Sequence, residues 1–146
     1  MKIAIACDHG ALELKNAIID HLNKQGHTVE NFGTDTLDSC DYPDYAGAAA
    51  RAVAAGQCER GIVLCSTGIG VSIAANKIKG IRCALLSDLM SARLTREHND
   101  TNMMAMGAFI VGVPLALQIV DTWIGTAFSG GERHARRIAK IGELEG

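Results

Sequence analysis

The chain has few aromatic residues and few prolines: one Trp, two Tyr, three Phe and two Pro among 146 residues. It also lacks an excess of either charge, because 14 Lys and Arg stand against 16 Asp and Glu, which gives a net charge of -2. Such a balance gives no general attraction to nucleic acid or to an anionic membrane, so we expect neither as a partner. Any site for a polyanion must therefore be local.

No long hydrophobic run is present either. The most apolar late segment, residues 109–124, is interrupted by Pro114, Gln118 and Asp121, and it falls short of the ~20 residues that a membrane span needs. The apolar stretch at the start, residues 3–7, is too short for a signal peptide. We therefore expect no membrane segment.

Paired cysteines are also missing. The chain has five cysteines, an odd number, and none of them forms a C-x-x-C motif. This pattern argues against a metal framework or a disulfide scaffold and favours a reducing, cytoplasmic location. With 48% hydrophobic residues, a chain of this length suits a single domain spanning residues 1–146.

What the chain does contain is an alternation of short apolar segments with longer segments of helical periodicity. This alternation predicts an α/β fold, a three-layer α/β/α Rossmann-like domain with a five-stranded parallel sheet. We expect a polar loop over 33–44, ended by Pro43, and a second polar segment, 97–100, closing a helix. The expected strands are 2–7, 27–32, 62–64, 81–86 and 103–106, and the expected helices are 11–25, 46–55, a segment through 73–75, 88–96, 113–124 and 133–141.

The most informative segment is the junction after the third expected strand. Two glycines, Gly68 and Gly70, allow the backbone to turn sharply between the strand 62–64 and the helix through 73–75. The positive end of that helix would stabilise an anion or an oxyanion in the turn. Cys65 stands at the carboxyl end of the strand, where open α/β sheets bind their ligands. A tight turn with a buried cysteine is the alternative, and spacing alone does not decide between them.

Other polar residues occur at places where they could join this turn. Asp8 and His9 end the first expected strand, so in a parallel sheet they share an edge with Cys65, although Asp-His after a strand is also a common turn. Arg133 and Arg137, four residues apart, share one helix face and suit a phosphate.

Alternatives stand beside these assignments too. The basic residues around His134, which include Arg136, could equally form a solvated helix end. His98 and Asn99 follow a helix, where an imidazole could move a proton near neutral pH or simply cap the helix.

Five motifs taken together resemble one family. They are C-D-H near the start, D-Y-P-D-Y, C-S-T-G-I-G-V-S-I-A-A-N-K-I, H-N-D-T-N and G-G-x-R-H-x-x-R. In this order and over nearly the whole chain, they resemble the type B ribose-5-phosphate isomerases, which are grouped with the galactose-6-phosphate isomerase subunits.

The resemblance implies a reaction and roles for the cysteine turn. Cys65 would be the base that moves a proton between C1 and C2 of an open-chain sugar, and Thr67 would move protons between the oxygens. This chemistry needs a base and a group that stabilises the charge appearing on oxygen. The enediolate oxyanion would be bound by the backbone N–H groups of the turn: Ser66, Thr67, Gly68, Ile69 and Gly70.

The resemblance also assigns the remaining site residues. His98 would help to open the furanose ring, and Asp8 would polarise the ring oxygens. Three residues would lie at the phosphate end, Asn99 would contact the sugar, and Tyr42 would pack on it. The family needs no metal or other cofactor, and it forms a homodimer, in some members a dimer of dimers, with each site built from both chains. The three phosphate residues would be His9, Arg133 and Arg137.

Two positions depart from the family pattern. Ser66 stands where the family usually has glycine, and Phe109 stands where the ribose-phosphate enzymes commonly have an arginine of the phosphate clamp. The expected substrate is ribose 5-phosphate; a hexose 6-phosphate of the allose or galactose type, or another sugar, is the alternative. A different class, a Rossmann-type nucleotide-binding module, is disfavoured because the glycine turn follows the third strand and no G-x-G-x-x-G is present. A purely structural oligomer would not explain why Cys65, Thr67 and His98 occur together with the arginine pair.

Overall fold

The computed structural model describes all residues, 1–146, and contains one five-stranded sheet. The strands lie in the order β2-β1-β3-β5-β4, and every neighbouring pair is parallel. The sheet is therefore the predicted parallel one. The strands are β1 (Lys2–Cys7), β2 (Thr28–Asn31), β3 (Arg60–Cys65), β4 (Cys83–Leu85) and β5 (Met103–Gly107).

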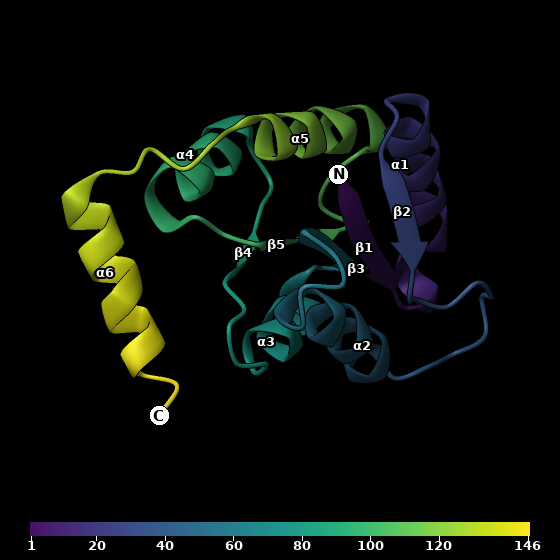
Figure 1. The fold of residues 1–146 in the computed structure, drawn as a ribbon. Helices are drawn as coiled ribbons and strands as arrows, with labels where there is room; N and C mark the ends of the chain where they lie inside the picture. Colours follow the sequence, from purple (N-terminus) through teal and green to yellow (C-terminus); the bar gives the residue numbers. More distant parts are fainter.

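Helices cover both faces of this sheet, which makes the three predicted layers (Figure 1). One face is covered by α1, α4 and α5, and the other is covered by α2 and α3. The helices are α1 (Leu12–Lys24), preceded by a 3-10 turn at His9–Ala11, α2 (Tyr42–Ala54), α3 (Ile69–Asn76), α4 (Leu89–Asn99), α5 (Val113–Gly125) and α6 (Glu132–Glu143).

The two faces of the sheet differ in the size of their side chains. Alternate residues of β1 point to opposite faces, so Ile3 and Ile5 join the large residues under α1 and α5, while Ala4 and Ala6 lie under α2. Four alanines of α2 are buried against this second face, which shows that small residues here serve close packing of helix on sheet: Ala46, Ala49, Ala50 and Ala52.

Two helices differ from the predicted boundaries. Helix α2 begins at Tyr42 rather than at Ala46, because Pro43 lies in the first turn, where a missing N–H costs nothing. Helix α4 continues past Arg96 to Asn99, because the turn that ends it falls at Asp100. The polar residues that were expected to form a closing segment are therefore the last turn of the helix.

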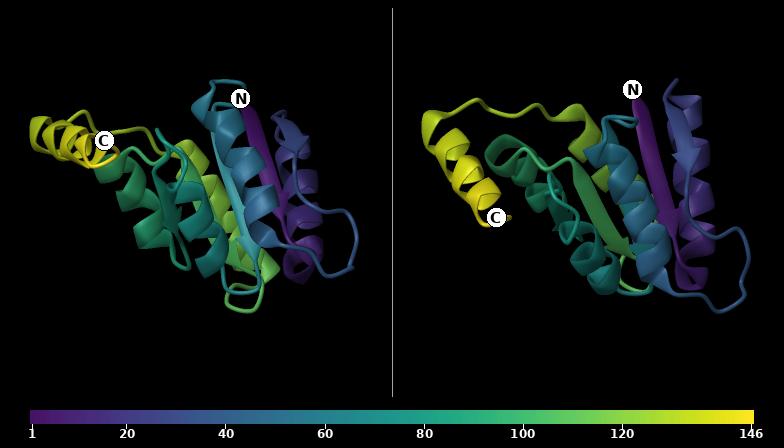
Figure 2. Two further views of the ribbon diagram at one scale, coloured as in Figure 1. Left: turned by 90° about the horizontal axis from the view of Figure 1, so that it is seen from below. Right: turned by 60° about the horizontal axis from the view of Figure 1, so that its bottom comes forward.

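Helix α6 stands away from the rest of the fold. Figure 2 shows it beside the end of the molecule where the N-terminus lies, and away from the turns that follow β3 and β5. None of its residues is buried, although Ile138, Ile141 and Leu144 recur at helical spacing. With at most 13 residues in any helix, the fold contains no helix with the length and apolarity of a membrane span.

Candidate active site

The strand order places a topological switch point at the carboxyl ends of β1 and β3. The connection after β1 returns through α1 on one face, and the connection after β3 returns through α3 on the other. Where the helices that follow two neighbouring strands lie on opposite faces of the sheet, the carboxyl ends of those strands are the usual ligand site of an open α/β sheet. Asp8 directly follows β1, and Cys65 ends β3, so the two lie at this point as predicted from sequence.

The turn after β3 depends on Gly68. Its φ is +77°, a left-handed conformation that favours glycine, and a Cβ there would lie 2.7 Å from the carbonyl carbon of Met106. The turn brings the N–H of Gly68 to 3.1 Å from Sγ of Cys65, and the side chain of Cys65 is only 6% exposed. The sulfur is thus fixed by the backbone at the start of α3.

The N–H groups of this turn fall into two sets. The N–H of Gly68 donates to the sulfur, and that of Ile69 donates to Oγ1 of Thr67 at 3.2 Å. The N–H groups of Ser66, Thr67 and Gly70 donate to no protein atom. Three donors beside the N-terminus of α3 therefore remain available to an oxyanion.

Asp8 and its neighbours lie against this turn. The carboxylate of Asp8 accepts the N–H of Gly10 at 2.9 Å, and the N–H of Asp8 donates to the carbonyl of Leu64 at 3.2 Å. The backbone of Gly10 lies directly beneath the hydroxyl of Ser66, because a Cβ at residue 10 would overlap that oxygen. The hydroxyl of Ser66 therefore lies beside Gly10 and near Asp8, at the carboxyl ends of the strands.

His9 is oriented by a residue that the sequence did not single out. Its Nδ1 accepts the backbone N–H of Cys40 at 3.3 Å, and Sγ of Cys40 lies 3.8 Å from the same nitrogen. Because Nδ1 is the acceptor, the neutral imidazole carries its proton on Nε2. Nε2 can then donate to an anion.

The loop that carries Cys40 is held by Lys15, which is fully buried. Its Nζ donates to the carbonyl oxygens of Gly33 (3.0 Å) and Thr34 (2.7 Å) and forms an ion pair with Asp35. A signal for this role exists in the sequence: Lys15 precedes Ile18, Ile19 and Leu22 at helical spacing and therefore lies on the apolar face of α1.

Tyr42 also reaches the turn. Its ring lies against the backbone of Gly70, where a Cβ would be 2.6 Å from Cζ of the tyrosine. Phe109 lies on the other side of the turn, with its N–H donating to the carbonyl of Ser66 at 2.9 Å and its side chain 80% exposed. These residues share the carboxyl ends of the strands, and we call them the carboxyl-edge group: Asp8, His9, Cys40, Tyr42, Cys65, Ser66, Thr67, Gly68, Ile69, Gly70 and Phe109.

The other predicted residues lie at the opposite edge of the sheet. Helix α4 begins after β4 and runs antiparallel to the strands, so His98 and Asn99 come near the start of β5. Consistent with this, Nε of Arg82, just before β4, donates to the carbonyl of Asn99 at 3.0 Å. Since β5 alone separates the two edges by roughly 13 Å, one chain does not bring these residues to Cys65.

Two helix ends meet at this opposite edge. The imidazoles of His98 and His134 are stacked, with 4.3 Å between ring centroids and 11° between planes. Arg133 and Arg137, on the same turns of α6, are exposed and form no ion pair within the chain. These residues lie near the amino ends of the strands, and we call them the amino-edge group: His98, Asn99, Arg133, His134 and Arg137.

Asp100 anchors the end of α4, a role that we did not assign from sequence. It is the only residue other than glycine with a positive φ, +45°, and its carboxylate accepts Nη1 of the buried Arg96 at 2.8 Å. The guanidinium of Arg96 also donates to the carbonyl of Thr101 at 2.6 Å. This network fixes the turn directly after His98 and Asn99.

Three of the other thiols are less acidic than a free cysteine. Burial raises the pKa of Cys7 and of Cys58 to about 11 and that of Cys83 to about 12, with the carboxylate of Glu30 adding to the shift at Cys58. None of these three belongs to the carboxyl-edge group, and all five cysteines are free thiols.

The fold and the turn define an α/β protein with a cysteine at a strand-to-helix turn that has three free N–H donors. The comparisons with known proteins agree. Residues 3–141 match the family model described as Ribose/Galactose Isomerase. Ribose-5-phosphate isomerase B of Escherichia coli is 47% identical over 144 residues, which cover 99% of this chain and 96% of that protein.

Two further matches agree. D-erythrulose-4-phosphate isomerase of Pectobacterium atrosepticum is 42% identical over 146 residues, 99% of this chain and 95% of that protein. The solved structure of ribose-5-phosphate isomerase B from Clostridium thermocellum superposes with a TM-score of 0.97 at 54% identity, covering 99% of this chain and 97% of that one. The chain belongs to the ribose/galactose isomerase family, which confirms the resemblance seen in the motifs.

Proposed function

We propose that the protein is an aldose–ketose isomerase that interconverts ribose 5-phosphate and ribulose 5-phosphate, with Cys65 as the base. The observation that carries the proposal is the fixed sulfur of Cys65 in a turn where the N–H groups of Ser66, Thr67 and Gly70 are free. A base beside an oxyanion site is what proton transfer next to a carbonyl requires.

The chemistry at this turn is then as follows. The thiolate of Cys65 removes the proton from C2 of the open-chain aldose, and the electrons of that C–H bond form the C1–C2 double bond. The carbonyl oxygen becomes an oxyanion, which the free N–H groups stabilise. The proton returns to C1, while Thr67 moves a proton from the oxygen on C2 to that on C1. Because Oγ1 of Thr67 accepts the N–H of Ile69, its own O–H is free to donate.

The remaining residues bind and prepare the substrate. His98 opens the furanose ring and Asp8 polarises its oxygens. His9, Arg133 and Arg137 hold the phosphate, and Asn99 and Tyr42 contact the sugar. No metal or other cofactor takes part in this scheme.

We further propose that the active unit is a homodimer, or a pair of dimers, in which the carboxyl-edge group of one copy meets the amino-edge group of the other. The separation of the two groups within one chain supports this arrangement. So do the exposed apolar side chains of Ile69 and Ile73 on α3 and a groove of about 610 Å³ that Ile141 and Leu144 of α6 help to line. A second copy would cover these surfaces.

The direct test is to add ribose 5-phosphate to the purified protein and to follow formation of the ketose by absorbance. Steady turnover that the Cys65→Ala variant lacks supports the proposal. If the protein binds the sugar phosphate without forming a ketose, it belongs instead to the binding-module class, and the proposal is wrong.

Phe109 favours a second candidate substrate. Its exposed ring stands where the ribose-phosphate enzymes commonly place an arginine, so a hexose 6-phosphate of the allose or galactose type, or another sugar, is the alternative. A panel of tetrose, pentose and hexose phosphates assayed at equal concentration ranks these by kcat/KM. The five free thiols fit a reducing compartment, and we expect the cytoplasm as the location.

A further inference from the structure

The stack of His98 on His134 has no role in the proposed reaction as described above. His98 lies in the last turn of α4 and His134 in the first turn of α6, and both rings are half-buried. Because α6 has no buried residue, this stack is one of the few side-chain contacts between the start of α6 and the body. A flat face-to-face contact fixes the plane of the His98 ring.

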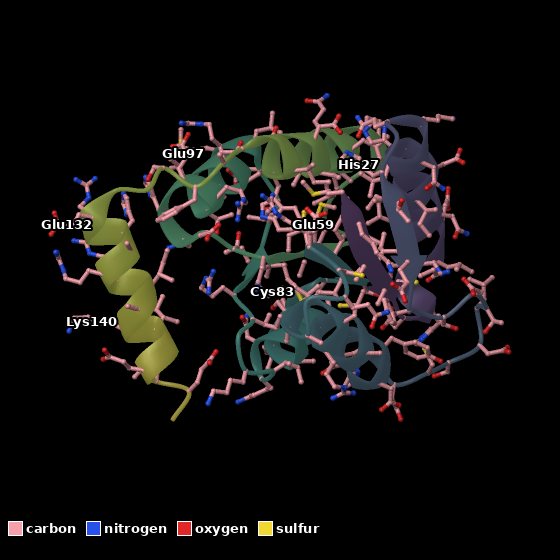
Figure 3. The ribbon with its side chains drawn as sticks, in the orientation of Figure 1. His27, Glu59, Cys83, Glu97, Glu132 and Lys140 are labelled. Atoms are coloured by element: carbon pink, nitrogen blue, oxygen red, sulfur yellow. The ribbon has the colours of Figure 1, made fainter.

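The segment before α6 holds the two rings together. Both the N–H and the hydroxyl of Ser129 donate to the carbonyl of Glu97, at 3.3 and 2.7 Å. The N–H of Gly131 in turn donates to Oγ of Ser129 at 3.3 Å, and a Cβ on this glycine would lie 3.1 Å from the His134 ring. Figure 3 labels Glu97 on α4 and Glu132 at the start of α6, the two helix ends that this segment joins.

The charges around the stack are mostly positive. From α6, Arg133, Arg136 and Arg137 flank His134, and none of them is paired with a carboxylate, while Glu132 is the one acid of the first turn. From α4, the carboxylate of Glu97 is engaged by Arg93 at 3.1 Å.

These neighbouring groups change the pKa of His134. Desolvation lowers the pKa of His134 below its usual value, and His98, Arg133 and Arg137 lower it further. All of these causes favour the neutral form of His134 in the free protein.

We propose that an anion bound by Arg133 and Arg137 is taken up together with a proton on the His98–His134 pair, and that His134 is a positioning residue for His98. The proposal rests on the proposed function for the assignment of these arginines to the phosphate and of His98 to ring opening. A bound dianion offsets the arginine charges that disfavour an imidazolium, so binding draws a proton from solvent. The proton then lies on the pair that faces the sugar ring, where ring opening needs an acid.

Thermodynamic linkage between anion binding and protonation makes the proton uptake measurable without the isomerase reaction. If the anion favours the protonated pair, protonation must favour the anion by the same factor. A coupling of one pKa unit corresponds to about a tenfold change in anion affinity between the acid and alkaline limits. Sulfate is the suitable probe, because it keeps its two charges from pH 5.5 to 7.5 and takes up no proton itself.

The experiment is isothermal titration of the intact protein with sulfate in two buffers of different ionisation enthalpy. We expect the wild type to take up a fraction of a proton per sulfate, and sulfate to bind up to about tenfold more tightly at pH 5.5 than at pH 7.5. In His134→Phe, which keeps a stacked ring but cannot be protonated, the uptake should fall at least about twofold. His9 is present in both proteins, so the difference between them belongs to the pair.

Two controls keep the outcome clear. His21→Phe removes an imidazole on α1 that pairs with Asp121 of α5, far from the His98–His134 pair in the sequence, and it should leave proton uptake unchanged. Arg133→Gln should weaken sulfate binding, which locates the anion. Equal heats in both buffers for the wild type, undiminished uptake in His134→Phe, or sulfate binding that ignores Arg133→Gln would each overturn the proposal. Since no sugar is used, a failed isomerase assay cannot be mistaken for this result.

Discussion

The carboxyl-edge group and the amino-edge group are built in different ways. The first is held by the sheet: the N–H of Gly68 bonds to the sulfur of Cys65, and the carboxylate of Asp8 caps a 3-10 turn. The second lies on two helix ends, and one of those helices, α6, has no buried residue. If the proposed function holds, the chain prepares the base and the oxyanion donors in advance, and the cations for the phosphate become confined only when another surface covers them.

This difference suggests a division of labour between chemistry and binding. Proton transfer needs donors fixed to a fraction of an ångström, which backbone atoms on buried strands provide. Phosphate binding tolerates more movement, because guanidinium groups on an exposed helix can adjust to the anion. Changes at Cys65 and Thr67 should therefore lower kcat, and changes at Arg133 and Arg137 should act on substrate capture.

The largest effect is expected from Cys65→Ala. Removal of the thiolate should lower kcat by at least ~100-fold, the low end for general-base catalysis, while the fold remains because the change is small and apolar. Steady-state kinetics and the thermal unfolding midpoint measure the two effects.

Cys58→Ala is the matched control, because it removes a sulfur that is equally buried but lies outside the carboxyl-edge group. Its kcat should equal that of the wild type. A folded Cys65→Ala protein with wild-type turnover would show that another group is the base.

Thiol alkylation should distinguish Cys65 from three buried or partly buried thiols, Cys7, Cys58 and Cys83, by a factor of similar size. Since the pKa of Cys7 is raised from 9.0 to about 11, its thiolate fraction at pH 8 is about 100-fold below that of a thiol with the unshifted value. The same sign holds for Cys58 and Cys83, so labelling of all three thiols should be slow at pH 8 and should increase steadily with pH up to about 11 for Cys7 and Cys58 and about 12 for Cys83.

Mass spectrometry of iodoacetamide-treated protein gives the rate at each position. We expect activity to be lost in step with labelling of Cys65, and substrate to slow both. Inactivation that follows Cys7 or Cys83 instead would contradict the assignment. No cysteine belongs to the amino-edge group, so this reagent reports on one half of the site alone.

The sequence predicted the carboxyl-edge group well for physical reasons. A β-branched strand, a turn with two glycines and a following helix are local signals, and parallel strands share an edge, so the meeting of Asp8 with Cys65 could be expected from topology. The contacts of Lys15 and Cys40 could not, because they depend on where a ten-residue loop folds back.

The amino-edge group shows where sequence patterns fail. The run of polar residues after Arg96 indicated the end of a helix, yet the helix continues to Asn99, because a tertiary network with Arg96 stabilises the left-handed conformation of Asp100. The His98–His134 stack joins segments 36 residues apart, which no local pattern predicts.

Complementation of two inactive chains tests whether the two groups meet across a dimer. Chains with Cys65→Ala and chains with His98→Asn are each expected to be nearly inactive. In a random mixture half of the dimers are mixed, and one of the two sites in each mixed dimer has both residues intact, so about a quarter of the wild-type activity should return. Activity is measured after unfolding and refolding the mixture, with subunit exchange checked by mass.

The control is a mixture of Cys65→Ala with a second carboxyl-edge variant, Thr67→Val. Cys65 and Thr67 belong to the same site on the same chain, so each site of a mixed dimer lacks one of the two residues. That mixture should regain nothing beyond the activity of its parents. If the first mixture also stays inactive despite proven exchange, Cys65 and His98 act within one chain and the shared site is wrong.

The smallest effect, and the one that decides the substrate, concerns Phe109→Arg. A charge-assisted hydrogen bond from an arginine to phosphate is worth roughly 1.5–3 kcal/mol, so its absence weakens binding by about 10- to 100-fold. The backbone of Phe109 is fixed by its hydrogen bond to Ser66, and its side chain is 80% exposed, so the substitution needs no repacking of the core.

If the protein is a pentose phosphate isomerase that lacks one clamp residue, Phe109→Arg should lower KM for ribose 5-phosphate about tenfold or more at unchanged kcat. Phe109→Leu, which removes the ring without adding a donor, should leave KM unchanged. If Phe109→Arg instead abolishes turnover of ribose 5-phosphate, or if the unaltered protein converts a hexose 6-phosphate faster, the apolar wall of Phe109 serves a different sugar, and the chemistry assigned to Cys65 still stands because it acts only on C1 and C2.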